Sequence, residues 1–323
     1  MVRKKVLLLL VGVATTTLLG VAVHVRADRN THAPANAKLR SNSKEESTVI
    51  QKNEKPKNAK NNTAVKPEPV SNKTSALQNS SIIWQENFGS YNSSVPNPVY
   101  WNTAGASQPI YNNEQQKYDA SSQTVRIEDG NLILEAHKTP AGYISGLVNT
   151  KGKIMITQGT RLEARIKLPK GRGVWPAFWL LSNNQPHTSK LNPTTADWES
   201  DRFYMRDGEI DIMESYGTYP GVVEATVHTF AQSIEQQLSL GDEGFHTYWM
   251  EWRADKLIMG VDSRTISIYA SSSDTSKWPF TADNQMYVIL NLAMGGSGGG
   301  SIVTSSTDSW KMYISSIVYS KLQ

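Results

Sequence analysis

Three carboxylates lie within six residues in the segment 208–214, which reads GEIDIME. Large apolar side chains separate them, and a solvated run of charges needs no such spacers. An amphipathic helix would space its apolar residues three and four apart, but here they stand at positions 210, 212 and 213. The chemistry that this segment can perform therefore depends on another secondary structure.

A β-strand with one irregularity would bring the three carboxylates together. Glu209 and Asp211 point to the same face because side chains alternate along a strand. Glu214 would point to the opposite face unless one extra residue interrupts the alternation. A β-bulge at Ile212 and Met213 supplies that residue, and bulges often redirect side chains beside active sites. We therefore predict a bulged strand whose acids share one face and whose isoleucines face the core.

Such a carboxylate cluster could cleave a glycosidic bond. Ionised carboxylates repel one another, so at least one pKa should rise and create a proton donor near neutral pH. Retaining glycosidases need a protonated acid and an ionised carboxylate about 5 Å apart. Glu209 and Glu214 start about 13 Å apart at Cα, and inward-leaning side chains can close most of that gap. Asp211 can orient the nucleophile by a hydrogen bond. The alternative is an edge strand with solvated acids.

Composition divides the 323 residues into three parts. Residues 1–27 have a basic start and an apolar stretch, the pattern of a cleaved secretion signal peptide, with an uncleaved anchor as the alternative. Residues 28–80 are polar and contain no aromatic residue, so we predict a disordered linker. Residues 81–323 hold all nine tryptophans and form the predicted catalytic domain. We therefore expect a secreted or cell-surface-associated protein.

The net charge of +4 arises from the N-terminal parts. Residues 28–80 hold ten Lys/Arg and five Asp/Glu, whereas residues 81–323 hold 19 and 24. An acidic domain gives no support for nucleic-acid binding. The basic linker could associate loosely with an anionic cell wall, although most such segments are only soluble spacers. The chain has no cysteine, which excludes cysteine-ligated metals and leaves stabilisation to the core.

Short alternating segments recur through the predicted domain. Residues 161–168 alternate polar and apolar side chains, as a half-buried strand does. Two β-rich runs flank residues 128–131, which is a hairpin signal. Further strands are predicted within residues 245–268, 286–292 and 312–319. No long stretch has helical periodicity, so we predict an all-β sandwich of two antiparallel sheets.

The chain resembles glycoside hydrolase family 16, and within it the laminarinase-like branch with a bulged Glu-x-Asp-x-x-Glu strand. The resemblance covers most of residues 82–320. Besides GEIDIME, the matching segments are YNNEQ at 111–115, VRIEDGNLILEA at 125–136, RLEARIKLPKGRGVWPAFW at 161–179, ATVH at 225–228, FHTYWMEW at 245–252, WPF at 278–280 and ILNLAMGG at 289–296. The resemblance implies a β-jelly-roll with a glycan-binding cleft on a concave sheet.

The resemblance also implies an endo-β-1,3(4)-glucanase that acts with retention of configuration. Glu209 is then the nucleophile, Asp211 its hydrogen-bonding helper and Glu214 the acid/base. The implied substrate contacts are Trp175, Trp179, His228 and Asn113. Aromatic rings can stack on the apolar faces of sugars. Core packing is the alternative for His228 and Trp179.

Three departures from the family pattern bear on specificity and metal binding. Leu147 stands where laminarinase-like members usually carry Arg. The Gly-rich segment 295–300, expected to be a flexible loop, has Ser297 in place of their usual Trp. Ser315 and Ser316 stand near the acid that binds calcium in many members. We therefore expect no cofactor, with a weakly held structural calcium ion as the alternative, and an insertion at 183–203 that reshapes one cleft end.

These features together predict a monomer that hydrolyses polysaccharide. If a sugar hydroxyl replaces water, the same site becomes a transglycosylase on cell-wall or exopolysaccharide glycan. The missing Arg and Trp contacts leave room for a non-catalytic glycan-binding module, although a pure binder has no need for a repulsive carboxylate trio. A structural cell-wall protein held by the basic linker is a third alternative.

Overall fold

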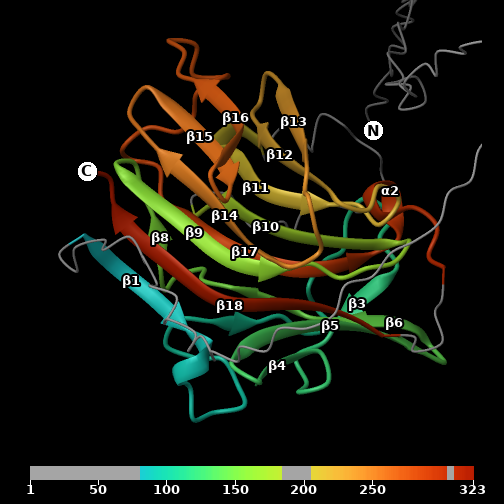
Figure 1. Ribbon diagram of the computed structural model, residues 1–323. Helices are drawn as coiled ribbons and strands as arrows, with labels where there is room; N and C mark the ends of the chain where they lie inside the picture. Colours follow the sequence, from blue (N-terminus) through green and yellow to red (C-terminus); the bar gives the residue numbers. More distant parts are fainter. Residues whose placement is uncertain (1–80, 184–204, 304–308) are drawn as a thin grey trace, which may run out of the picture. The chain divides into compact units, whose positions relative to one another are not determined.

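The computed structural model describes residues 81–183, 205–303 and 309–323, and these residues form two packed β-sheets (Figure 1). The predicted leader at 1–27, the linker at 28–80 and all but one residue of the insertion at 183–203 lie outside the described residues. Within the described ranges, no helix has both the length and the apolar character needed to span a membrane.

The first sheet has ten strands, in the order β16-β15-β14-β9-β18-β5-β6-β3, with β1 beside β18 and β4 beside β5. Its strands are β1 (Ile82–Asn87), β3 (Gln116–Tyr118), β4 (Val125–Glu128), β5 (Asn131–Thr139), β6 (Gly142–Ser145), β9 (Thr160–Lys167), β14 (Phe245–Trp252), β15 (Lys256–Val261), β16 (Arg264–Ala270) and β18 (Ser309–Lys321).

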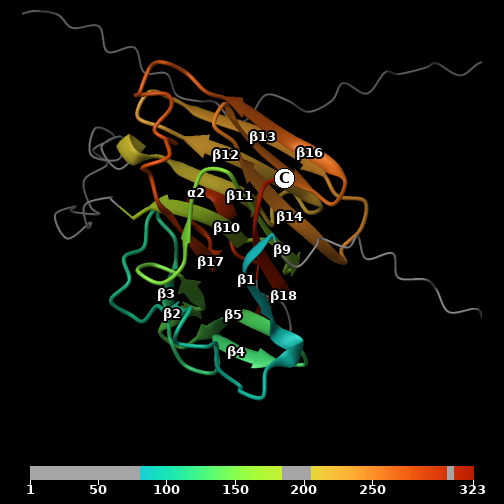
Figure 2. The ribbon, with the colours of Figure 1, turned by 90° about the vertical axis from the view of Figure 1, so that its left-hand side faces the viewer.

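The second sheet has eight strands, in the order β13-β12-β11-β10-β17-β7-β2, with β8 beside β17. Its strands are β2 (Asn102–Thr103), β7 (Leu147–Asn149), β8 (Met155–Ile156), β10 (Val174–Ser182), β11 (Glu209–Ser215), β12 (Val222–His228), β13 (Ser233–Ser239) and β17 (Met286–Met294). Figure 2 shows β13, β12, β11, β10 and β17 following one another from top to bottom. The described helices are short: η1 (Phe88–Ser90), η3 (Met205–Asp207) and α2 (Gly296–Gly299).

The core lies between the two sheets and is filled from both. Inward side chains alternate along the strands, so each sheet contributes every second residue. Fully buried members include Leu162, Ile166, Tyr248, Met250 and Trp252 from the first sheet, and Phe178, Leu180, Ile210, Ile212 and Leu290 from the second. The predicted two-sheet sandwich is confirmed.

Local sequence signals account for several elements. The predicted hairpin is confirmed, because Asp129 and Gly130 join β4 and β5 with φ of 50° and 75°, as a primed turn requires. Two findings differ from the predictions. Strands β3 and β6 pair in parallel within an otherwise antiparallel sheet. The Gly-rich segment expected to be a flexible loop forms one helical turn, α2.

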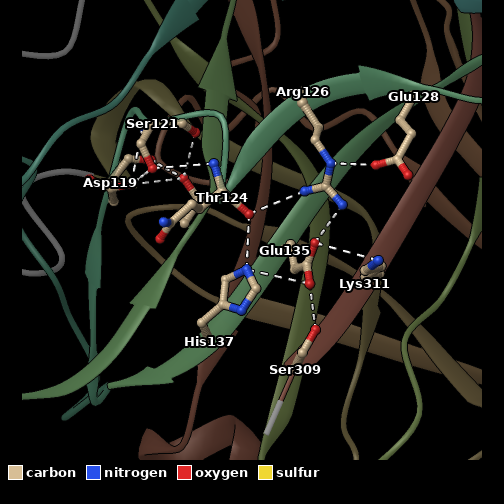
Figure 3. Close-up of polar contacts among 10 residues, drawn as sticks. Asp119, Ser121, Thr124, Arg126, Glu128, Glu135, His137, Ser309 and Lys311 are labelled. Atoms are coloured by element: carbon tan, nitrogen blue, oxygen red, sulfur yellow. Dashed lines mark hydrogen bonds and ion pairs between the residues drawn. The ribbon is translucent and has the colours of Figure 1, made fainter. Parts of the chain in front are cut away.

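A polar network binds three strands together on the outer face of the first sheet (Figure 3). Glu135 of β5 is buried, and its carboxylate lies 2.7 Å from Arg126 Nη2 and 3.7 Å from Lys311 Nζ. His137 Nε2 lies 3.3 Å away, and Ser309 donates a hydrogen bond to the same carboxylate. A buried carboxylate is tolerated only when it is paired in this way. The network therefore stabilises the contact of β4 and β18 with β5.

Core packing behind the carboxylate strand yields a stability prediction. Phe178 of β10 is fully buried and pairs with Met213 of β11 and Leu290 of β17. We expect Phe178→Ala to lower the free energy of unfolding by about 3–5 kcal/mol, because it removes apolar contact and leaves a cavity. Urea denaturation monitored by tryptophan fluorescence measures this.

The matched control is Ile268→Ala on β16, whose side chain is 62% exposed. It should change the free energy of unfolding by no more than about 0.5 kcal/mol. Equal losses in the two variants would contradict the assignment of Phe178 to the core.

Candidate active site

The predicted bulge is present in β11. Asp211 pairs with Thr226 and Glu214 with Glu224, so Ile212 and Met213 together oppose one residue of β12. The register with β10 shifts at the same place. Both bulge residues are fully buried in the core. The acids consequently lie on the outer face of the eight-stranded sheet. The edge-strand alternative is wrong, because β10 and β12 flank β11.

The glycine that precedes β11 has a structural reason. Gly208 has φ of +81°, a left-handed conformation that favours glycine. A Cβ atom at this position would lie 2.4 Å from the ring of buried Phe280. The entry to the carboxylate strand therefore needs a residue without a side chain.

Strand pairing arranges the outer-face side chains of β10, β11 and β12 in three rows. The first row contains Leu181, Glu209 and His228, the second contains Trp179, Asp211 and Thr226, and the third contains Ala177, Glu214 and Glu224. Neighbouring side chains within a row stand about 5 Å apart at Cβ. Each acid is therefore flanked by particular residues, which give the three carboxylates different surroundings.

Glu214 is held from both sides. Trp175 Nε1 donates a hydrogen bond of 2.7 Å to its Oε1 atom, and the Tyr216 hydroxyl lies 3.2 Å from its Oε2 atom. Burial raises the pKa of Glu214 to about 8, assisted by the charge of Asp211 and only partly opposed by the Trp175 donor. Glu214 is thus oriented and keeps its proton at neutral pH.

Glu209 and Asp211 form a group with His228. The three offer ligand atoms within 4.8 Å of one another. His228 Nε2 lies 3.2 Å from Asp211 Oδ2, and its Nδ1 lies 2.6 Å from Ser233 Oγ. Burial and the charge of Asp211 raise the pKa of Glu209 to about 8, partly opposed by His228. Burial and the charge of Glu224 hold the pKa of Asp211 well above its ordinary value.

The two predicted tryptophans both lie beside the acids. Trp175 packs against Tyr216 with ring centroids 5.7 Å apart. Trp179 is partly buried, and its Nε1 donates a hydrogen bond of 2.7 Å to Asn291 Oδ1. Asn291 in turn donates to the Tyr118 hydroxyl at 3.0 Å. Trp179 is therefore held in place on the outer face of the sheet and is also part of an apolar cluster there.

Asn113 lies on a loop that contacts α2. It is exposed, with φ of 57°, on the loop before β3. The amide of Ser297 in α2 donates to the carbonyl of Asn112 at 2.8 Å, which joins this loop to α2. A Cβ atom at Gly298 would lie 2.6 Å from the Trp175 indole, so α2 packs directly on that ring. The loop that carries Asn113 therefore contacts the same helical turn that packs on Trp175.

Comparison with known proteins decides the family. The family model of glycosyl hydrolases family 16 matches residues 112–314, more than half of the chain. The chain belongs to this family. A β-glucanase from Rhodothermus marinus is 33% identical over 239 residues, which cover 68% of this chain and 77% of that protein. The chain is therefore a glycoside hydrolase.

Solved structures agree with the fold of this family 16 hydrolase. A non-specific endo-β-1,3(4)-glucanase from family GH16 superposes with a TM-score of 0.63 and 29% identity, covering 75% of this chain and 91% of that one. The laminarinase from Rhodothermus marinus superposes with a TM-score of 0.64 and 27% identity, covering 75% and 97%. The sandwich is thus the β-jelly-roll of this family.

The structure shows the surroundings of Leu147, one of the positions that depart from the family pattern. Leu147, which stands where relatives usually carry Arg, is buried on the outer face of the second sheet. It packs in an apolar cluster with Ile289, Tyr287 and Tyr118. An apolar side chain replaces a charged one here, so any sugar contact at this position differs from the one expected in laminarinase-like members.

One hollow in the described part of the hydrolase lies away from the carboxylates. It has a volume of about 490 Å³ and is lined by polar residues of β2, β7 and their loops, including Asn102, Gln108, Asn149 and Lys151. None of the three acids lines it. The chemistry is therefore placed by the acids on β11, and this hollow lies at the opposite edge of the same sheet.

Residues that sequence reasoning missed surround Glu214. Glu224 lies opposite it on β12, Tyr216 contacts both glutamates, and Gln237 of β13 donates to Glu224 Oε2 at 2.6 Å. Strand alternation could have found Glu224, since it stands four residues before His228 and so shares its face. The same rule places Tyr216 on the face of Glu214.

The group of Glu209, Asp211 and His228 raises the question of a metal. Carboxyl and imidazole groups can together bind a divalent cation. The carboxyl groups must then be ionised and the imidazole must be neutral. Here His228 Nδ1 has a hydrogen-bond partner in Ser233, and Nε2 lies 3.2 Å from Asp211 Oδ2. Burial raises the pKa of both carboxyl groups, so protons compete with a cation for their oxygens. We therefore expect no resident ion at this group.

Metal removal is accordingly expected to have no effect. We expect the hydrolase, after treatment with excess EDTA and desalting, to keep the thermal midpoint and the laminarin-degrading activity of the untreated protein. Loss of stability that calcium restores would reveal a structural ion. Loss of activity that zinc restores would instead place a metal at the three-residue group.

Proposed function

We propose that this hydrolase is a retaining endo-β-1,3(4)-glucanase. The observation that carries the proposal is the bulge in β11, which turns Glu209, Asp211 and Glu214 to one face while Trp175 holds Glu214 by a hydrogen bond. The similarity to a β-glucanase and to laminarinases supports a β-glucan as the substrate. A pair of carboxyl groups with distinct surroundings is what double displacement requires.

In the first step, Glu214 acts as the acid and Glu209 as the nucleophile. The Glu214 O–H bond breaks as its proton moves to the glycosidic oxygen. The electron pair of the anomeric C–O bond leaves with that oxygen, and Glu209 forms a new bond to the anomeric carbon. The products are a shortened glucan and a glycosyl-enzyme. The raised pKa of Glu214 supplies the proton at neutral pH.

Asp211 acts as the helper of the nucleophile. Burial raises its pKa and so favours its protonated form, which can donate a hydrogen bond to the ionised form of Glu209. Their oxygens lie within 4.8 Å of each other, which leaves a small movement to make that bond. Asp211 thereby stabilises the charge on Glu209 until the nucleophile attacks.

In the second step, water replaces the departed glucan. Glu214, now ionised, takes a proton from water, and the resulting oxygen attacks the anomeric carbon and releases Glu209. Two inversions give net retention. If a sugar hydroxyl takes the place of water, the same step forms a new glycosidic bond, which product sizes distinguish.

We also propose the substrate contacts and the place of action. Trp175 and Trp179 would stack on sugar rings, His228 would bind beside Glu209, and Asn113 would reach the glycan from its loop. The pattern of residues 1–27 supports export, so the substrate would be an extracellular polysaccharide.

Substitution of the two glutamates tests the proposal. We expect Glu214→Gln to lower reducing-end release from laminarin by about 10²–10⁴-fold, because the general acid and base is lost. We expect Glu209→Gln to abolish release, because no glycosyl-enzyme can form. Azide added to Glu214→Ala should yield a β-glycosyl azide, since attack on the glycosyl-enzyme then needs no base.

Circular dichroism of each variant controls for folding. Full activity in both folded glutamine variants would refute the assignment. Oligosaccharides longer than the starting substrate would favour the transglycosylase, and unchanged laminarin binding without cleavage by the parent protein would favour a glycan-binding module.

The pH dependence provides a second test. The acids of the cluster repel one another, so their protons leave in steps that belong to the group. Activity needs Glu209 ionised and Glu214 protonated, so kcat/KM should be bell-shaped. Burial and mutual repulsion raise both pKa values to about 8, so the active form, with Glu209 ionised and Glu214 protonated, is populated as the first of the two protons leaves and is lost as the second leaves above about pH 8. Initial rates on laminarin across acidic, neutral and alkaline buffers measure this, and constant activity well above pH 8 would contradict it.

A further inference from the structure

A fourth carboxylate lies directly behind Glu214. Glu224 pairs with Glu214 across β11 and β12 and is only 6% exposed. Its Oε2 atom accepts a hydrogen bond of 2.6 Å from Gln237, and its Oε1 atom accepts one of 2.8 Å from the Tyr216 hydroxyl. A buried and a half-buried carboxyl group side by side are costly unless protons and donors compensate their charges.

The Tyr216 hydroxyl is shared by both carboxyl groups. It lies 2.8 Å from Glu224 and 3.2 Å from Glu214. A hydroxyl carries one hydrogen atom and two lone pairs. If both carboxyl groups were ionised, only one contact could be a hydrogen bond and the other would be repulsive. If Glu214 is protonated, both contacts can be hydrogen bonds, because Glu214 can donate to Tyr216 while Tyr216 donates to Glu224.

We propose that Tyr216 and Glu224 are positioning residues that keep Glu214 in its proton-donating state through the hydroxyl that both carboxyl groups share. This inference rests on the proposed acid/base function of Glu214. Neither residue is proposed to touch the reacting atoms. Burial and the neighbouring carboxylates raise the pKa of Tyr216, so its hydroxyl keeps its own proton throughout.

The shared hydroxyl also suits the second step. Once Glu214 has given its proton to the leaving oxygen, the Tyr216 hydrogen can turn from Glu224 to the newly ionised Glu214. Glu224 keeps the hydrogen bond from Gln237. Two negative charges then lie side by side, which favours the return of a proton to Glu214 and so strengthens it as the base that activates water. No proton leaves Tyr216 or Glu224 in this sequence.

The charged groups that face Glu214 come from two strands. Glu209 and Asp211 lie on β11, and Glu224 and His228 lie on β12. Strand β10 contributes the uncharged donor Trp175. Because the negative charge of Glu224 raises the pKa of Glu214, its removal should lower that pKa and shift the alkaline limb of the activity profile to lower pH.

The test compares pH profiles of kcat and kcat/KM on laminarin. We expect Glu224→Gln to move the alkaline limb down by more than about half a pH unit with little change in KM. The matched control is Glu235→Gln, which removes an exposed carboxylate from the outer face of neighbouring β13 and should leave the profile unchanged. Tyr216→Phe keeps the ring beside Trp175 and should lower kcat about tenfold or more.

The outcomes separate this inference from the proposed function. In one outcome, Glu214→Gln loses activity, Glu224→Gln keeps the alkaline limb of the parent's pH profile, and Tyr216→Phe keeps the parent's kcat. Only the positioning role is then refuted. Equal shifts in Glu224→Gln and Glu235→Gln would also refute it, because a general charge effect would explain both. Full activity in Glu214→Gln would refute the proposed function itself. If Glu224→Gln fails to fold, Tyr216→Phe alone decides through kcat.

Discussion

One additional residue in β11 is the constraint on which the rest of the site depends. In a regular strand, Glu214 would point into the core and Met213 would point away from it. Burial of a carboxylate among apolar side chains costs far more than a local break in a ladder of backbone hydrogen bonds. The bulge resolves the conflict, because Ile212 and Met213 both enter the core and Glu214 turns to the outer face. Its register with β12 then determines which residues stand beside each acid.

That arrangement concentrates carboxyl groups, and the protein compensates with protons and neutral donors. Trp175, Tyr216 and Gln237 each supply a hydrogen atom to a carboxyl oxygen. His228, held by Ser233, lies on the other side of the cluster beside Asp211. The core beneath consists of apolar side chains from two large sheets, so the stability of the domain does not rest on the cluster. A repulsive site is tolerated because the sandwich is stable without it.

Much of this fold could be predicted from local patterns. Alternation at residues 161–168 predicted β9 to within one residue at each end, and the turn at Asp129 and Gly130 predicted the hairpin of β4 and β5. The bulge was predictable from residue spacing. Glu209 and Glu214 are five residues apart, so they can share one face of a strand only if one extra residue lies between them. The parallel pairing of β3 with β6 was not predictable, because a three-residue strand carries no pattern that selects its partner or direction.

The candidate site was predictable only in part. The residue types and their spacing identified the acids of β11. They did not identify the residues that hydrogen-bond to these acids or shift their pKa values, because those contacts depend on the register between strands. Alternation places Glu224 on the same face of β12 as Thr226 and His228, but only the register of β12 with β11 shows that it lies opposite Glu214. The helical turn α2 is another example. Four residues of glycine and serine have little helical preference, so its contact with Trp175 is needed to order it.

The contact between α2 and Trp175 also restricts how this enzyme can diversify. Any side chain at Gly298 would collide with the indole that orients Glu214, so a substitution at that position is sterically unfavourable. Ser297, its exposed neighbour, has no such restriction. One residue of the turn can therefore change while the adjacent residue must remain glycine. The same asymmetry makes Ser297 the natural site for randomisation in a laboratory library.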